Sequence, residues 1–194
     1  MKKTVLCGLL CALLMGLAGC GSSTPTADEN GTPWSEDWVM VGQNMGVENP
    51  QGFTLRDVKG AKKMFFTSWS AGEARPHTNG QGEEGEVYEA QLVLLLSGAS
   101  SAESAQATVD EWLTMARDTY AVTDTTQKVC NGRDFTLLTY DFASDASAYA
   151  YGASAFAVDG ANAISAELAC QDTFGGDPVD ILTDFLEHCH YAAN

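Results

Sequence analysis

The sequence predicts an α+β fold in which an antiparallel β-sheet is covered by two main helices, an α/β/α sandwich. Three observations predict it. Two stretches place apolar residues at helical spacing, and four strand-like segments joined by tight turns lie between these stretches. The 194 residues are 45% hydrophobic, which is enough to build a single core.

The first twenty residues form a targeting segment and not part of the fold. Lys2 and Lys3 supply a short positive region, and a leucine-rich apolar stretch follows from residue 4 to residue 15. The tetrapeptide Leu17-Ala18-Gly19-Cys20 comes next. A positive start followed by an apolar stretch is typical of an export signal.

The tetrapeptide at residues 17–20 resembles the lipobox of bacterial lipoproteins, with all four positions matching the family pattern. The resemblance implies that the signal peptide is cleaved after Gly19. It also implies that Cys20 carries a diacylglycerol thioether and fatty acyl chains such as palmitate. We therefore expect a lipoprotein anchored to the cell membrane and facing the extracytoplasmic side. The alternative is an ordinary secretory signal with a chance cysteine.

Three regions follow from this assignment. Residues 1–19 are expected to be the signal peptide, residues 20–33 the lipidated cysteine and a flexible tether, and residues 34–194 one globular domain. The tether prediction rests on the polar, Gly/Ser/Thr-rich composition of residues 21–32.

The charge of the chain is strongly acidic, with 10 Lys+Arg against 26 Asp+Glu and a net charge of −16. Such a surface repels phosphate backbones, so nucleic-acid binding is excluded. It is also repelled by anionic bilayers, so the lipid has to hold the protein on the membrane.

The first predicted helix begins at the capping box Ser100-Ser101-Ala102-Glu103. Its apolar stripe consists of Val109, Trp112, Leu113, Ala116 and Tyr120. The second helix begins at Asp177-Pro178, with Asp177 as N-cap and Pro178 in the first helical position. Its stripe consists of Leu182, Phe185, Leu186 and Cys189.

Hairpin signals divide the segment between the helices into strands. Asn131-Gly132 and Asp159-Gly160 suit tight turns whose central residues need positive φ. The strands predicted from these turns are 121–130, 133–142, 149–158 and 162–170. Before the first helix, the strands predicted are 38–41, 52–56, 64–69 and 86–97.

Residues 100–194 resemble the PsbP-like fold. The resemblance is carried by the Asn131-Gly132 hairpin leading into residues 135–140, by Tyr149-Ala150-Tyr151, by the Asp159-Gly160 turn and by the closing helix. It implies an antiparallel sheet with packed helices and a docking role, since members of that fold commonly act as docking subunits. It assigns no activity.

Three cysteines lie beyond the predicted anchor, at positions 130, 170 and 189. In the predicted topology, Cys130 lies at one end of the antiparallel run and Cys170 at the other. The last helix returns across the sheet and brings Cys189 toward Cys130. We expect a Cys130–Cys189 disulfide, or at least their proximity. The alternative is three buried thiols in a reducing environment.

The irregular segment from Ser70 to Gly85 holds two scarce residue types, Arg75 and His77, beside Glu83 and Glu84. Long connections are often functional. One interpretation is a recognition loop for a ligand or partner. A calcium loop and a solvated mobile loop are the alternatives, although the acidic spacing fits no EF-hand.

The sequence contains no nucleophile elbow, HExxH motif, P-loop, dinucleotide fingerprint or CxxC pair. We therefore expect no catalytic residues, no metal and no cofactor apart from the acyl modification. The predicted function is a lipid-anchored extracytoplasmic module that binds an envelope protein, a peptide or a small ligand. The alternative is a small cell-envelope hydrolase with its active site near residues 70–85. A cleft gathering His77, an acid and a Ser or Thr would favour that alternative.

Overall fold

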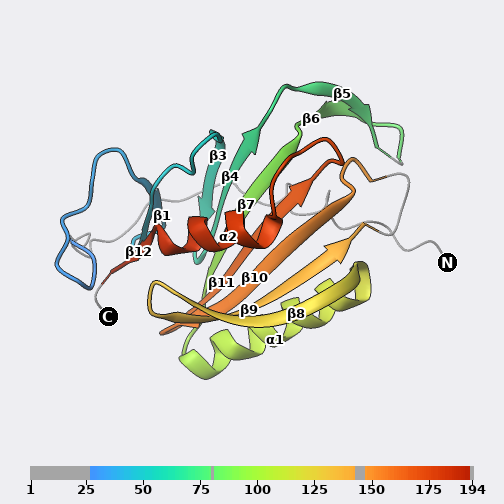
Figure 1. Ribbon diagram of the computed structural model, residues 1–194. Coiled ribbons are helices and arrows are strands. Elements are labelled where there is room, and N and C mark those ends of the chain that lie inside the picture. The colour runs from blue at the N-terminus through green and yellow to red at the C-terminus, as the bar shows by residue number, and fades with distance from the viewer. Residues whose placement is uncertain (1–26, 80, 143–146, 193–194) are drawn as a thin grey trace.

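The computed structural model describes residues 27–79, 81–142 and 147–192, so the predicted lipobox and Cys20 lie outside the described residues. A seven-stranded antiparallel sheet forms the centre of the molecule, with strand order β3-β4-β7-β11-β10-β9-β8 (Figure 1). Its strands are β3 (Thr54–Ala61), β4 (Met64–Ala71), β7 (Ala90–Gly98), β8 (Ala121–Cys130), β9 (Arg133–Asp141), β10 (Tyr151–Asp159) and β11 (Asn162–Cys170). The predicted antiparallel run between the helices is confirmed.

Two helices pack on this sheet: α1 (Ala102–Thr119) and α2 (Pro178–Glu187). The predicted cap of α2 is confirmed, because the Asp177 carboxylate accepts hydrogen bonds from the amides of Val179 and Asp180. The cap of α1 lies one residue later than predicted. The Ser101 hydroxyl, and not that of Ser100, accepts from the Ser104 amide at 3.2 Å.

The two faces of the sheet carry separate cores. On β10, Ala153 and Ala155 belong to the core under α2, whereas Phe156 belongs to the core under α1. Side chains alternate between faces along a strand, so the helices lie on opposite faces. Their main packing contacts are with β8, β9, β10 and β11. The predicted sandwich is therefore right for this half of the sheet.

The expectation that helices cover the sheet is wrong for its other half. A second, three-stranded sheet with order β1-β2-β12 packs there, with β1 against β4. Its strands are β1 (Val39–Val41), β2 (Met45–Val47) and β12 (Cys189–Tyr191). The sequence signal for β12 is weak because the strand has three residues and its partner β2 is far away in the chain. None of the described helices is long and apolar enough to span a bilayer.

Residues 27–33, predicted to be part of a flexible tether, instead pack on the end of the domain. Asp28 forms an isolated bridge with Ala192 and is 5% exposed. Its carboxylate accepts hydrogen bonds from the amides of Asn30 and Thr32, and Glu29 pairs with Arg133. These charge-assisted contacts hold residues 27–33 against the rest of the domain.

The long strands define two ends of the molecule. On β11, Cys170 pairs with Ala90 and Tyr151, while Asn162 pairs with Gly98 and Asp159 at the opposite end. A nine-residue strand separates these ends by about 27 Å. We call the end with Asn162 the turn end and the end with Cys170 the hairpin end.

The β10–β11 turn is centred on Gly160 and Ala161, one residue later than predicted, because Asp159 and Asn162 still pair.

Candidate functional site

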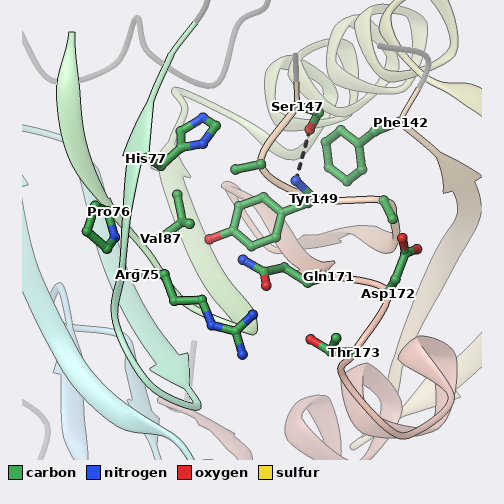
Figure 2. A pocket seen from close by; sticks show the side chains of 12 residues that line it. Arg75, Pro76, His77, Val87, Phe142, Ser147, Tyr149, Gln171, Asp172 and Thr173 are labelled. Carbon is green, nitrogen blue, oxygen red and sulfur yellow. Dashed lines mark hydrogen bonds between the residues drawn. The ribbon is translucent and has the colours of Figure 1, made fainter. Parts of the chain in front are cut away.

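A cavity of about 860 Å³ opens at the hairpin end of the sheet. Three segments surround it: the hairpin of β5 (Arg75–Thr78) and β6 (Glu84–Val87), the segment before β10, and the segment after β11. Figure 2 shows the hairpin side chains on one side, Tyr149 and Gln171 in the middle, and Phe142 and Asp172 on the far side.

The segment 70–85, predicted to be an irregular loop, is mainly this β-hairpin. Arg75 pairs with Val87 and His77 with Gly85, so Arg75 and His77 project from the same face. Both line the cavity. The hairpin also shortens the predicted strand 86–97, since β6 ends at Val87 and β7 begins at Ala90.

Arg75 is held in place by Glu89, which precedes β7. The Arg75 Nη2 donates to Glu89 Oε1 at 3.2 Å. Glu89 lies against Gly72, where a Cβ would be 2.6 Å from Glu89 Cγ and where φ is +81°. Only glycine suits this position, because it has positive φ and no side chain. The glycine therefore allows Glu89 to reach Arg75.

Glu83 and Glu84 do not line the cavity. The Glu83 carboxylate accepts from the Asn79 side-chain amide at 2.8 Å, and Asn79 Oδ1 accepts from the amides of Gln81 and Glu83. Asn79 thus organises the hairpin turn. Glu84 pairs with Thr78, one residue from His77, and so projects from the opposite face. Of the four residues predicted for recognition, the structure brings two to the cavity.

The middle of the cavity is aromatic. Tyr149 is 8% exposed, and its hydroxyl donates to Gln91 Oε1 at 3.3 Å. Its ring lies 6.2 Å from that of Phe142. The Ser147 hydroxyl accepts from the Tyr149 amide at 3.2 Å, as the dashed line in Figure 2 shows. These contacts fix the orientation of the ring that a bound molecule would meet.

The remaining wall consists of Gln171, Asp172 and Thr173, which follow β11. The Gln171 amide donates to the Glu89 carbonyl at 2.8 Å and the Phe174 amide to the Gln171 carbonyl at 3.0 Å. The Tyr151 hydroxyl donates to the Phe174 carbonyl at 2.6 Å, and burial raises the pKa of this tyrosine. The wall is therefore anchored to Glu89, the residue before β7, and to Tyr151 on β10.

The cavity gathers His77, Asp172, Ser147 and Thr173, residue types that also serve in hydrolases. Among the described residues, however, no hydrogen bond joins His77 to any of the other three. An activated hydroxyl needs a base in hydrogen-bond reach. The arrangement as it stands supplies donors on the hairpin side, an acceptor on the opposite side and aromatic rings between, which suits binding. Within the described residues, no group of three metal-ligating side chains is assembled.

The cysteines at positions 130, 170 and 189 are buried free thiols. Cys130 and Cys189 both lie at the turn end. Burial is the main cause that raises the pKa of Cys189, and the neighbouring Cys130 raises it further. The Asn131 side-chain amide donates to the Cys189 carbonyl at 2.5 Å, which ties this hairpin to β12. Cys170 lies at the hairpin end, and burial raises its pKa to about 12.

Sequence reasoning missed Tyr149, Phe142 and residues 171–173 as partners of Arg75 and His77. No local motif marks them. The available signal was topological: a strand near 90–97 that pairs with 162–170 brings its start, next to the hairpin, beside the residues that follow 170.

Comparisons with known proteins complete this description. No protein-family model matches the chain, and no curated protein matches it either. Among solved structures, the chain is similar to the solution structure of cyanobacterial PsbP (CyanoP) from Synechocystis sp. PCC 6803. The similarity has a TM-score of 0.49 and 14% sequence identity, and covers 90% of this chain and 98% of that one. At this level no activity, partner or location follows from it.

Proposed function

We propose that this protein is a lipid-anchored, extracytoplasmic binding module that holds a peptide segment of an envelope protein in the cavity at the hairpin end. The observation that carries the proposal is the composition of the cavity, in which Arg75 and His77 stand across an aromatic centre from Asp172. Because the chain is strongly acidic, two basic side chains on one wall of a cavity would select for a ligand with an acidic group.

The chemistry of the walls suggests how a peptide would lie. An acidic group would accept hydrogen bonds from Arg75, whose guanidinium keeps further N–H donors beyond the one given to Glu89. A basic group or an amide would face Asp172. The Tyr149 ring would cover an apolar side chain between them. The acyl chains predicted on Cys20 support a position at the membrane surface, where such segments are available.

A photo-crosslinking experiment tests the proposal. Benzoylphenylalanine is placed at His77 in the full chain, and at Thr125, an exposed position on β8 that does not line the cavity. We expect adducts to envelope polypeptides from position 77 only, mapped by mass spectrometry to acidic segments. Adding Arg75→Glu should reduce the yield several-fold. Equal adducts from both positions, or an unchanged yield with Arg75→Glu, would refute the peptide site.

A hydrolase is the second candidate, favoured by the gathering of His77, Asp172 and Ser147 around one cavity. Closure on a substrate would have to bring these groups into hydrogen-bond contact. Turnover of fluorogenic esters by the purified chain, lost in His77→Ala and kept in Thr125→Ala, would support it. Absence of turnover across ester and amide substrates favours the binding module.

A further inference from the structure

A second cavity, of about 540 Å³, lies at the turn end of the sheet. Four connections surround it: the β1–β2 turn, the β3–β4 turn, the link from β7 to α1, and the β10–β11 turn. Its lining residues are Gly42, Gln43, Asn44, Lys62, Lys63, Phe65, Gly98, Ala99, Ala161 and Asn162.

The lining is unusual for this chain. It holds two lysines and three carboxamide side chains, and no Asp or Glu is among its residues. The whole sequence has 26 acidic against 10 Lys+Arg residues. A cavity whose polar side chains are all either cationic or neutral, in a chain this acidic, is suited to an anion.

The cavity is also preorganised by backbone contacts. The Gly98 amide donates to the Lys63 carbonyl and the Ala99 amide to the Ala161 carbonyl, both at 2.7 Å. Phe65 lines the cavity, and Gly42, with φ of +68°, lets its ring approach, since a Cβ there would be 2.9 Å from the ring. Three of the four connections are therefore locked together, and the ring fixes the position of the fourth.

Both lysines line the cavity. Lys62 has a φ of +56°, a conformation that a lysine adopts at a cost, yet a lysine occupies this place. The Lys63 ammonium donates to the Ala99 carbonyl at 3.3 Å, which uses one of its three protons.

The position of the cavity relative to the start of the described chain indicates the source of the anion. The Ala192 amide donates to the Asn44 carbonyl at 2.8 Å, and Ala192 forms the bridge with Asp28. In the sequence, Cys20 lies only seven positions before Ala27, the neighbour of Asp28. A lipid on Cys20 would thus hold the turn end, and not the hairpin end, at the bilayer surface.

We propose that the cavity bounded by Lys62, Lys63, Asn44 and Asn162 binds a phosphate group, and that this phosphate belongs to an anionic phospholipid headgroup. The second part rests on the anchoring in the proposed function. Headgroup binding would orient the domain so that the cavity with Arg75 and His77 faces away from the membrane.

The test is a lysine footprint of the full acylated chain in vesicles of phosphatidylcholine with or without phosphatidylglycerol. Acetylation with an N-hydroxysuccinimide ester should slow several-fold at Lys62 and Lys63 when phosphatidylglycerol is present. Lys59, on the same hairpin but outside the cavity lining, is the matched control and should change little. Equal protection of all three lysines would show general attraction to the surface and would overturn the proposal.

A second arm separates the site from the anchor. Glycerol 1-phosphate is added to the Cys20→Ser chain, which has no lipid. We expect the same protection of Lys62 and Lys63, and a rise in melting temperature. The rise should persist in Lys59→Gln and vanish in a variant combining Lys62→Asn with Lys63→Gln, where asparagine keeps the positive φ.

The outcomes distinguish the parts of the proposal. Protection in both arms, or by phosphatidylglycerol vesicles with Lys59 unchanged, supports the headgroup. Protection by glycerol phosphate alone supports the phosphate site and overturns the headgroup as its source. If Cys20 carries no lipid, the vesicle arm fails while the second arm still reports on the cavity. Protection in neither arm overturns the site.

Discussion

Glu29 and Arg133 lie 104 positions apart in the sequence and form a two-pronged ion pair, with Arg133 Nη2 2.8 Å from Glu29 Oε2. The same guanidinium donates to Asp159 Oδ1 through Nε at 3.0 Å and Nη2 at 2.8 Å. It also lies 4.1 Å from the centre of the Tyr191 ring. One arginine thus joins the first described segment, the β9–β10–β11 end of the sheet, and β12.

Replacing this arginine should destabilise the fold strongly. In Arg133→Gln, the carboxylate of Asp159, which is 7% exposed, loses its charged partner inside the protein. Breaking a buried pair in this way costs about 3 kcal/mol of unfolding free energy. Urea denaturation followed by tryptophan fluorescence would measure the loss, and proteolysis near residues 27–33 should become faster.

The control for this variant is Lys59→Gln. Lys59 pairs with Asp57 at 3.0 Å, but both side chains are 46% exposed. An exposed pair contributes about 0.5 kcal/mol or less. If both variants lost the same stability, burial of the Arg133 network would not be what holds the N-terminal segment.

Local signals were enough to predict the regular elements of the second half. Asn131 and Gly132 both have positive φ, as the hairpin interpretation requires, and Asp177 caps α2 through two amides. Each prediction depends on residues that lie within a few positions of one another. The energy that selects these conformations is local, so one sequence reveals it.

The rest depended on contacts between distant segments. His190 lies in β12 and stacks on Trp38 with ring centres 3.8 Å apart. Its ring nitrogens lie 3.2 Å from Asp28 and 3.0 Å from Glu48. Nothing near position 190 indicates partners at 28, 38 and 48. For the same reason, only the Arg75 side of the candidate site could be predicted. The order of the strands in the sheet, and not sequence spacing, brings Tyr149 and Asp172 to the cavity that Arg75 lines.

Glu167 should make the stability of this protein depend on pH. It lies on β11, both its carboxylate oxygens are 3.2 Å from the Tyr120 hydroxyl, and burial raises its pKa to about 7. An acid with a raised pKa in the folded state stabilises the fold most below its ordinary value of 4.5. This contribution is lost as the pH rises through 7, up to about 3 kcal/mol.

The variant Glu167→Gln isolates the effect, because glutamine keeps an acceptor for Tyr120 and carries no charge. We expect it to be more stable than the original chain at pH 8 and similar to it at pH 4. Melting temperatures measured across this range would show the difference growing between pH 5 and pH 8. A constant difference would mean that Glu167 does not titrate in this window.

Cys20 should carry the lipid. Cells grown with an alkyne analogue of palmitate should label the original chain and not Cys20→Ser, and the variant should move from the detergent phase to the aqueous phase in Triton X-114 partition. The physical reason is that two or more acyl chains hold a protein on a bilayer, while the polypeptide here is strongly acidic. Equal membrane retention of both proteins would refute anchoring at this residue.

Cys130 and Cys189 should be the pair that oxidises if the exported protein forms a disulfide. Both are fully buried at the turn end, whereas Cys170 lies at the opposite end of β11, about 27 Å along that strand from Asn162. A bridge between them closes a long loop and would add about 4 kcal/mol to the unfolding free energy.

Comparison of unfolding with and without dithiothreitol measures the effect of this bridge. The reductant should lower the stability of the original chain and of Cys170→Ser to the level of Cys130→Ser. It should leave Cys130→Ser and Cys189→Ser unchanged, since neither can form the bridge. Alkylation of the unfolded, unreduced chain should modify Cys170 alone. A bridge containing Cys170 would contradict the topology, because it would require two opposite ends of one sheet to meet.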